Sequence, residues 1–244
     1  MWDNALLLRN IANTLLFLAV SAAVSGAAYY MVHLPGMFPL HSVRLSVAPQ
    51  QVVAEDVLAV VRGELRGNFF TVDIDHLRQA LEKLPWVRSV NIRREFPDRL
   101  MVQLEEHQAL AHWNNSARFD GLRTELVNRQ GEVFNGESKQ AMPNFIGKAG
   151  DANEIAQHYA QFSKQLAVLN LQLNQIALSP RHAWQLRLSN GMLLELGREE
   201  MQSRLARFVA VYPYSLAEHS GSVRYVDMRY RNGFAVGGMT KVEG

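Results

Sequence analysis

The first strongly patterned segment of the chain is a long run without charge. Between Arg9 and Arg44 there is no Lys, Arg, Asp or Glu. Residues 11–32 form a mostly apolar stretch of 22 residues, which would span about 33 Å as a helix, close to the thickness of one hydrocarbon core. The pattern predicts a transmembrane helix over 11–34, preceded by a short cytoplasmic tail over 1–10.

Two other interpretations of this run stay open. Small residues at Gly26, Ala27 and Ala28 would suit a signal peptidase, and a buried helix of a soluble protein has similar composition. The uncharged run is longer than the apolar core of a usual signal peptide, so we expect an uncleaved anchor. Arg9 and the amino terminus favour a cytoplasmic tail. The expectation is therefore a single-pass type II protein of the cell inner membrane, with its folded part in the periplasm.

After the span, the hydrophobic pattern predicts a strand over 38–47, helices over 50–65 and 73–86, and then a hairpin. Asp73 or Asp75 can cap the second helix. The apolar positions that define the strand and helices are Leu40, Val43, Leu45, Val47, Val53, Val57, Val60, Val61, Ile74, Leu77, Leu81 and Leu84.

The hairpin lies in "LPWVRSVNIRREFPDRLMVQLEEH" (84–107), where Val90 and Ile92 alternate with polar residues and "FPDR" turns the chain. Its charges invite three interpretations: a solvated face, a protein-binding face or a nucleic-acid surface. Four arginines and four carboxylates can pair one for one across the strands, which favours the solvated face. These residues are Arg88, Arg93, Arg94, Arg99, Glu95, Asp98, Glu105 and Glu106.

The pattern in the remainder of the chain predicts a second unit of helices on largely antiparallel strands. The sequence predicts a hairpin over 125–134, amphipathic helices over 152–173 and 199–212, a type I′ hairpin at Asn190-Gly191 and a second Asn-Gly hairpin at Asn232-Gly233. The stripe of the first helix consists of Ile155, Tyr159, Phe162, Leu166 and Leu169. The fold class is therefore α+β.

Composition removes several kinds of chemistry. Lys and Arg number 25 against 23 Asp and Glu, so a net charge of +2 does not call for nucleic acid, and the absence of cysteine rules out thiol chemistry and disulfides. The motifs of acyl transfer, zinc proteolysis and nucleotide binding are missing. His107 and His112 beside two glutamates could suggest a metal, but their odd spacing would put them on opposite faces of a strand. We expect no enzyme activity, cofactor, metal or small-molecule substrate.

Six segments together carry a resemblance to a known family. In this order and spacing they resemble the FtsQ/DivIB family of bacterial cell-division proteins, over almost the whole chain. The resemblance implies a POTRA (polypeptide-transport-associated) domain at 38–107 and a β domain at 108–240. The segments are "GNFFTVD" (67–73), "LPWVRSVNIRREFPDRL" (84–100), "ALAHW" (109–113), "AWQLRLSNG" (183–191), "LGREEMQSRLARFVAVYP" (196–213) and "YVDMRYRNGFAVG" (225–237).

The resemblance also implies a function: a non-catalytic scaffold of the divisome at the division septum, which assembles and regulates septal cell-wall synthesis. It implies binding to FtsB held with FtsL, and to other divisome proteins through the POTRA domain. The alternative is a POTRA-bearing factor for polypeptide transport or outer-membrane assembly, which would usually carry several such units and a barrel. The residues implied in partner binding are Arg181, Arg229, Tyr230, Asn232, Gly233, Phe234 and Gly237. Gly238 stands where some relatives have a bulky aromatic residue, so Phe234 or Met239 would have to supply that anchor.

Overall fold

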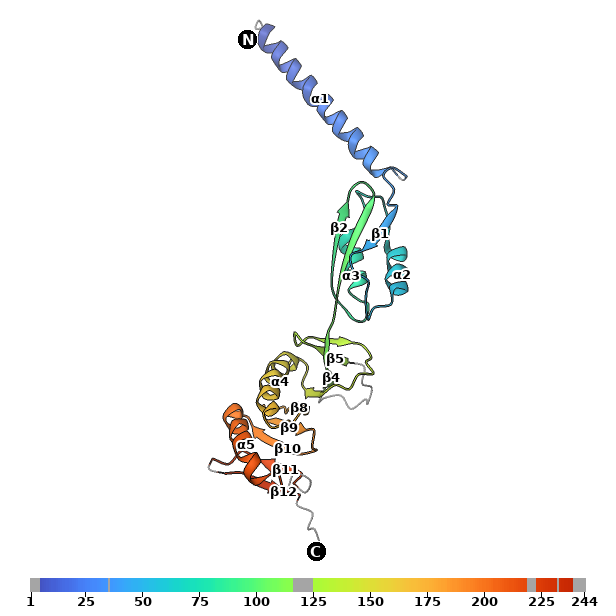
Figure 1. Cartoon of the computed structure of the whole chain (residues 1–244). Coiled ribbons are helices and arrows are strands. Elements are labelled where there is room, and N and C mark those ends of the chain that lie inside the picture. The colour runs from blue at the N-terminus through green and yellow to red at the C-terminus, as the bar shows by residue number, and fades with distance from the viewer. Residues whose placement is uncertain (1–4, 35, 116–124, 219–222, 232, 239–244) are drawn as a thin grey trace. The chain divides into compact units, whose positions relative to one another are not determined.

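The computed structural model describes residues 5–34, 36–115, 125–218, 223–231 and 233–238 (Figure 1). The chain divides into two units, Met1–Glu106 and His107–Gly244, each with its own hydrophobic core. Asn232 and Met239, both named above, lie outside the described residues.

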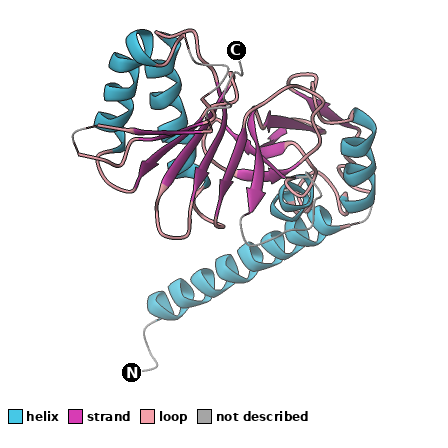
Figure 2. Ribbon diagram, turned by 90° about the horizontal axis from the view of Figure 1, so that it is seen from below, coloured by secondary structure: helices cyan, strands magenta, loops and turns pink. Residues whose placement is uncertain are grey.

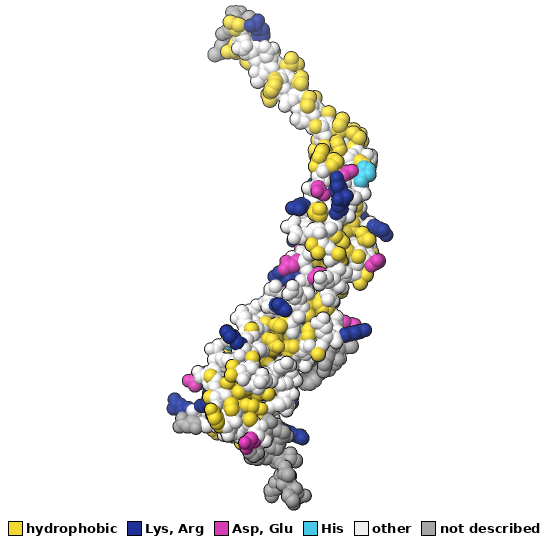
Figure 3. All heavy atoms as spheres, viewed as in Figure 1, with side chains coloured by type: hydrophobic (Ala, Val, Ile, Leu, Met, Phe, Trp, Pro, Cys, Tyr) yellow, Lys and Arg dark blue, Asp and Glu magenta, His cyan; other side chains and the backbone are white. Residues whose placement is uncertain are grey.

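Helix α1 (Ala5–His33) is a continuous helix of 29 residues. It begins before the expected start at residue 11, because the leucines at 6–8 are good helix formers and extend it. Its segment Leu6–His33 has a mean hydropathy of 1.8, and its most apolar window has no side chains buried in the protein. Apolar side chains cover much of its visible surface (Figure 3). The helix fits a single-pass membrane anchor.

The rest of the first unit is a three-stranded sheet in the order β1-β3-β2, with β1 parallel to β3 and β2 antiparallel to it. Both helices after α1 bury valines and leucines in its core. Of the two candidate caps, Asp73 is the one that acts, since its carboxylate accepts the His76 N–H at 2.9 Å. The elements are β1 (Ser42–Leu45), α2 (Ala54–Glu64), α3 (Ile74–Leu81), β2 (Val87–Glu95) and β3 (Arg99–Glu106).

The alternation predicted for the hairpin is confirmed, because Val90, Leu100 and Val102 are buried while Asn91 and Gln103 are exposed. Val47 was expected to be a core position of the first strand, and this is wrong. The strand ends at Leu45, and Val47 is 69% exposed.

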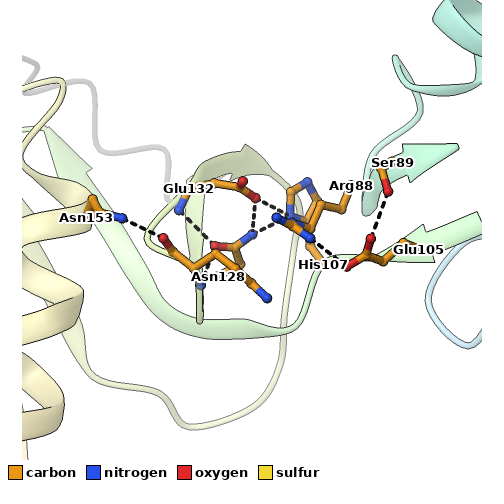
Figure 4. Close-up of polar contacts among 8 residues, drawn as sticks. Arg88, Ser89, Glu105, His107, Asn128, Glu132 and Asn153 are labelled. Atoms are coloured by element: carbon orange, nitrogen blue, oxygen red, sulfur yellow. Dashed lines mark hydrogen bonds and ion pairs between the residues drawn. The ribbon is translucent and has the colours of Figure 1, made fainter.

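One-for-one pairing of the hairpin charges is also wrong. Arg88 does pair with Glu105 at 2.6 Å, and Ser89 bonds to the same carboxylate at 2.9 Å (Figure 4). Arg94 instead donates to main-chain carbonyls. Glu106 accepts the N–H groups of three consecutive residues, 50–52, at 2.8 to 3.1 Å. Arg94 and Glu106, which the sequence pattern assigned to solvent, therefore bond to main-chain groups of irregular segments.

The second unit is a nine-stranded sheet in the order β12-β11-β10-β9-β8-β7-β4-β5-β6. Helices α4 and α5 lie side by side against one of its faces (Figure 2). Each helix connects two parallel neighbours, β7 to β8 and β10 to β11, as parallel pairing requires a crossover. The elements are β4 (Ala109–Asn115), β5 (Glu125–Asn128), β6 (Val133–Asn135), β7 (Asn144–Gly147), α4 (Ala152–Ala167), β8 (Leu173–Leu178), β9 (Trp184–Leu188), β10 (Leu193–Gly197), α5 (Met201–Ser215), β11 (Tyr225–Asp227) and β12 (Ala235–Gly237). The α+β class is confirmed.

One row of apolar side chains crosses this sheet, each residue directly opposite the next in register. All but the last are buried, and they pack in one core with α4 and α5. The last member, Val236 on β12, is 37% exposed. The row consists of Trp113, Phe145, Ile176, Leu186, Leu194, Val226 and Val236. It therefore reaches the sheet edge without being closed off there.

The hairpin at Asn190-Gly191 exists, but its turn differs from the predicted type I′. Only Gly191 has a positive φ, +85°, and its N–H donates to the Leu188 carbonyl at 3.0 Å. This is a type I turn followed by one left-handed residue, a common three-residue connection. The link between β11 and β12 is longer still, spanning 228–234. The type I′ turn was therefore the wrong prediction at Asn190-Gly191. Strands β11 and β12 do pair as the predicted second hairpin, although Asn232 of its connection lies outside the described residues.

Candidate partner-binding surface

Among the strands that the structure describes, β12 is the last in the sheet order and pairs with β11 alone. A strand in this position presents unpaired N–H and C=O groups on its outer side, which can bond to an added strand. Gly237 in β12 lies opposite Tyr225, and a Cβ at Gly237 would be 3.4 Å from the tyrosine ring. The edge is thus real, but its strand is only three residues long.

Arg229 follows β11 and is bound to a buried carboxylate. Its Nε donates to Asp227 Oδ1 at 2.9 Å and its Nη2 to Oδ2 at 2.6 Å, and its main-chain N–H also reaches Oδ1 at 2.9 Å. The Asp227 side chain is 7% exposed and that of Arg229 56%. The Arg229 hydrogen bonds hold the pKa of Asp227 below its usual value. Burial, followed by the Asp227 charge, raises the pKa of Tyr225.

Arg181, on the connection between β8 and β9, is brought next to Arg229. Both line a shallow depression of 330 Å³, to which α5 and the residue after β10 each add an arginine. We call this set the arginine depression: Arg181, Arg198, Arg204 and Arg229. Of the described residues that line it, Glu199 is the one with a carboxylate, and this group is 3.7 Å from Arg198. Basic side chains from four parts of the chain therefore converge at the end of the sheet where β9 begins and β10 and β11 finish.

Gly197 explains how the arginines can sit so close to the sheet. It has φ +73°, and a Cβ there would lie 2.8 Å from Arg204 Nη1 and 3.1 Å from Arg229 Cγ. Arg204 Nη1 also donates to the Leu196 carbonyl at 2.6 Å. The backbone angle favours glycine at this position, and a Cβ would also displace the Arg204 guanidinium. Arg198 and Arg204 were missed by sequence reasoning, since four arginines scattered over 181–229 give no local signal.

Arg207 of α5, also missed, organises the loop that follows β11. Its Nη1 donates to the Arg231 carbonyl at 2.7 Å, and its Nη2 to those of Met228 and Tyr230, each at 2.9 Å. The Tyr230 side chain remains 58% exposed. An arginine beside Phe208 in an otherwise apolar turn of α5 was the available signal.

The remaining predicted residues divide between surface and core. Phe234 is half-buried and packs on the core of the second unit, so it is a weaker candidate for an exposed anchor. Gly233 is half-buried in the same loop. Gly238 has φ +79°, and a Cβ there would be 3.0 Å from the Arg224 Cβ. A bulky aromatic residue does not suit this backbone, which accounts for glycine at that position.

His107, the residue considered for a metal, is placed in a local polar network (Figure 4). Its Nδ1 lies 2.9 Å from Asn128 Nδ2, and its ring stacks on Phe134 at 4.1 Å. Asn128 is buried and accepts the N–H groups of Gln130 and Glu132. Within the described ranges, no three His, Asp or Glu side chains are grouped to hold a metal ion. This network stabilises the β5–β6 turn.

Comparison with known proteins agrees with this architecture. Residues 38–107 match the family model "POTRA domain, FtsQ-type", and residues 111–229 match "Cell division protein FtsQ/DivIB, C-terminal". The chain is 41% identical to the cell division protein FtsQ of Nitrosospira multiformis, over 98% of this chain and 99% of that protein. It is 37% identical to FtsQ of Burkholderia pseudomallei, over 97% and 94%, and 36% identical to FtsQ of Escherichia coli, over 70% and 62%. The chain therefore belongs to the FtsQ/DivIB family of cell division proteins.

Proposed function

We propose that the chain is a non-enzymatic scaffold of the bacterial divisome. In this role α1 anchors it in the inner membrane at the septum, with the tail in the cytoplasm and both folded units in the periplasm. The second unit binds FtsB, which is held with FtsL as a membrane-anchored coiled coil. Family membership and the apolar helix α1 support the setting, and the open β12 edge supports the mode of binding.

The observation that carries the proposal is the unfinished end of the sheet. A partner strand bonded to the outer side of β12 would extend the ladder by main-chain bonds. An apolar residue on that strand would cover Val236 and continue the row that crosses the sheet. Tyr230, exposed in the preceding loop, offers a second apolar contact.

The arginine depression supplies charge at the strand ends, where β11 finishes, but its members are not equivalent. Arg229 already pairs with Asp227, so replacing it would also leave a buried carboxylate without its partner. Arg181 is exposed and has no ion-pair partner in the described part of the chain. We therefore assign to Arg181 the direct pairing with an acidic side chain of FtsB, and to Arg229 a role that combines pairing with shaping the surface.

The test is binding of the full chain, in detergent or nanodiscs, to a soluble FtsB–FtsL fragment. Arg181→Glu should weaken binding by tenfold or more, on the order of the cost of facing a carboxylate with a like charge. Arg187→Glu is the matched control, because Arg187 is an exposed arginine on β9 that does not line the depression. Equal binding by wild type and Arg181→Glu would place the docking site elsewhere.

The polypeptide-transport alternative has less support. The chain has one POTRA unit, and it is similar to FtsQ proteins from end to end. A bound outer-membrane barrel, recovered with the full chain from membranes, would favour that alternative.

A further inference from the structure

Four phenylalanines of the first unit form a cluster that is unusually exposed. The rings of Phe38 and Phe70 are 5.0 Å apart, those of Phe69 and Phe70 5.1 Å, and those of Phe69 and Phe96 6.3 Å. Phe69 is buried, but Phe38 and Phe70 are each 44% exposed and Phe96 is 79% exposed. We call these four residues the phenylalanine cluster. Three exposed rings joined through Phe69 cost hydrophobic free energy in water unless a membrane or a partner surface covers them.

The cluster lies at one end of the three-stranded sheet. Ser42 at the start of β1 is paired with Arg99 at the start of β3, so the turn holding Phe96 lies at the end where β1 begins. Phe38 precedes β1, and its carbonyl accepts the Phe69 N–H at 2.9 Å. Segments distant in sequence therefore deliver their aromatic rings to the same end of the fold.

Chain length ties this end to the membrane helix. Phe38 comes five residues after His33, where α1 ends, and five residues can span at most about 18 Å. This limit holds however the sheet is oriented. Asn68, next to Phe69, also donates through Nδ2 to the Val32 carbonyl in the last turn of α1, at 2.6 Å. In Figure 3, hydrophobic side chains gather on the visible face of the first unit next to α1.

The chemistry around the cluster fits a lipid surface. Aromatic side chains favour the boundary between headgroups and acyl chains. Arg66 and Arg93 are exposed and precede Phe69 and Phe96 by three residues in sequence, while Glu95 beside Phe96 is exposed too. Of the carboxylates in the same turn, Asp98 is engaged by His41 at 3.0 Å. The aromatic rings rather than the charges therefore carry the proposed contact.

We propose that the phenylalanine cluster inserts into the interface of the leaflet at which α1 ends, so that the first unit lies against the bilayer as well as being tethered to it. The proposal rests on α1 as the membrane anchor and is independent of the β12 edge. The partner is a phospholipid bilayer, bound by the exposed rings of Phe38, Phe70 and Phe96.

The absence of cysteine in this chain permits a direct test. A spin label is attached to Phe96→Cys in the full chain, reconstituted in nanodiscs of phosphatidylethanolamine and phosphatidylglycerol. Collisions with oxygen, which concentrates in lipid, are compared with collisions with a water-soluble nickel complex. Ala48→Cys is the matched control, because Ala48 is exposed and lies beyond the opposite end of β1. Ala19→Cys, within α1, reports whether the anchor itself is in lipid.

The expected result is an oxygen-to-nickel ratio several-fold higher at position 96 than at position 48, and the same shift for Phe70→Cys. Contact with another protein copy would lower both collision rates at position 96, and this would overturn the proposal. A ratio at 96 equal to that at 48, with 19 in lipid, would also overturn it. An aqueous signal at 19 would refute the anchor, whereas failure of the scaffold function would appear only as lost FtsB–FtsL binding.

Discussion

At the scale of single residues, neighbours of the same type have different roles in this chain. Arg93 and Arg94 are adjacent on β2 and both exposed. Arg94 donates to the carbonyls of Phe69, Phe70 and Val72 at 2.8, 3.3 and 3.0 Å. An exposed arginine usually contributes little to stability, and the contacts of Arg94 make it an exception.

Arg94→Gln should lower the free energy of unfolding of the first unit by about 1–2 kcal/mol, because three carbonyls lose a charged donor. Arg93→Gln, the adjacent control, should change it by less than about 0.5 kcal/mol. The measurement is the urea midpoint of the full chain, with circular dichroism as the signal. Equal midpoints for the two variants would mean that water replaces the Arg94 bonds without loss.

Asp227 makes stability depend on pH. Its folded pKa lies below its unfolded pKa, because Arg229 bonds to the ionised form. The stabilisation is therefore complete above the unfolded pKa, about 4, and is lost as the pH falls through the folded pKa. In urea titrations, wild type should exceed Asp227→Asn in stability at pH 7, and the gap should narrow below about pH 4. A gap that does not change between pH 7 and acid would show that ionisation of Asp227 contributes nothing.

At the scale of elements, the proposed partner binding depends on the backbone N–H and C=O groups of strand β12. Consecutive residues of a strand direct their N–H groups to opposite sides. Of Ala235→Pro and Val236→Pro, one therefore removes a bond to β11 and the other removes an outward donor. We expect the second kind to keep the thermal midpoint close to that of wild type while weakening FtsB–FtsL binding at least tenfold. Differential scanning calorimetry and binding titration on the same preparations distinguish the two.

Should both proline variants bind as well as wild type, the partner does not add a strand at β12. Gly238→Ala serves as a stability control on the same edge, since its positive φ predicts strain without removal of a main-chain donor.

Element types were more predictable than the contacts at their ends. The stripe of Ile155, Phe162 and Leu166 correctly predicted a helix, because burial on a sheet requires a 3.6-residue period. Its predicted end at 173 was wrong, since α4 ends at Ala167 and Leu173 begins β8. The prediction for Val47 was wrong, because the alternation of apolar residues continues in the sequence after the β1 ladder ends at Leu45. The turn type at Asn190-Gly191 was wrongly predicted, because Asn-Gly occurs in several turn types and loop length selects among them.

The candidate site was only partly visible in sequence. Arg181 and Arg229 were named from family resemblance, and the fold brings them together in one depression. Arg207 stood out as an arginine in an apolar turn of α5, but its role could not be assigned, because its partners are carbonyls of the loop after β11. Arg204 bonds to Leu196 at the end of β10, a contact that only the fold reveals. Long-range main-chain acceptors leave no pattern in the residues that hold them.

At the scale of the whole molecule, the arrangement of the chain across the membrane can be tested with single cysteines. Asn4→Cys and Lys139→Cys flank α1, and Lys139 is exposed in the second unit. In cells with a permeabilised outer membrane, an impermeant maleimide should label position 139 and should reach position 4 only after lysis. The protein should also stay in the membrane fraction after alkaline carbonate washing. Labelling of position 4 in unlysed cells would reverse the topology, and release by carbonate would exclude an uncleaved anchor.

The nine-stranded sheet ends in two short strands, β12 and β6, each of three residues. Molecules gathered at high local density are exposed to a hazard, since one sheet can continue into the next and produce fibres. Three residues give a second copy few ladder bonds, too few to outweigh the entropy lost on joining. A partner segment that also contacts side chains outside β12 does not depend on ladder bonds alone. The short edge thus discourages self-polymerisation, while the proposed partner segment could still bind through its side-chain contacts.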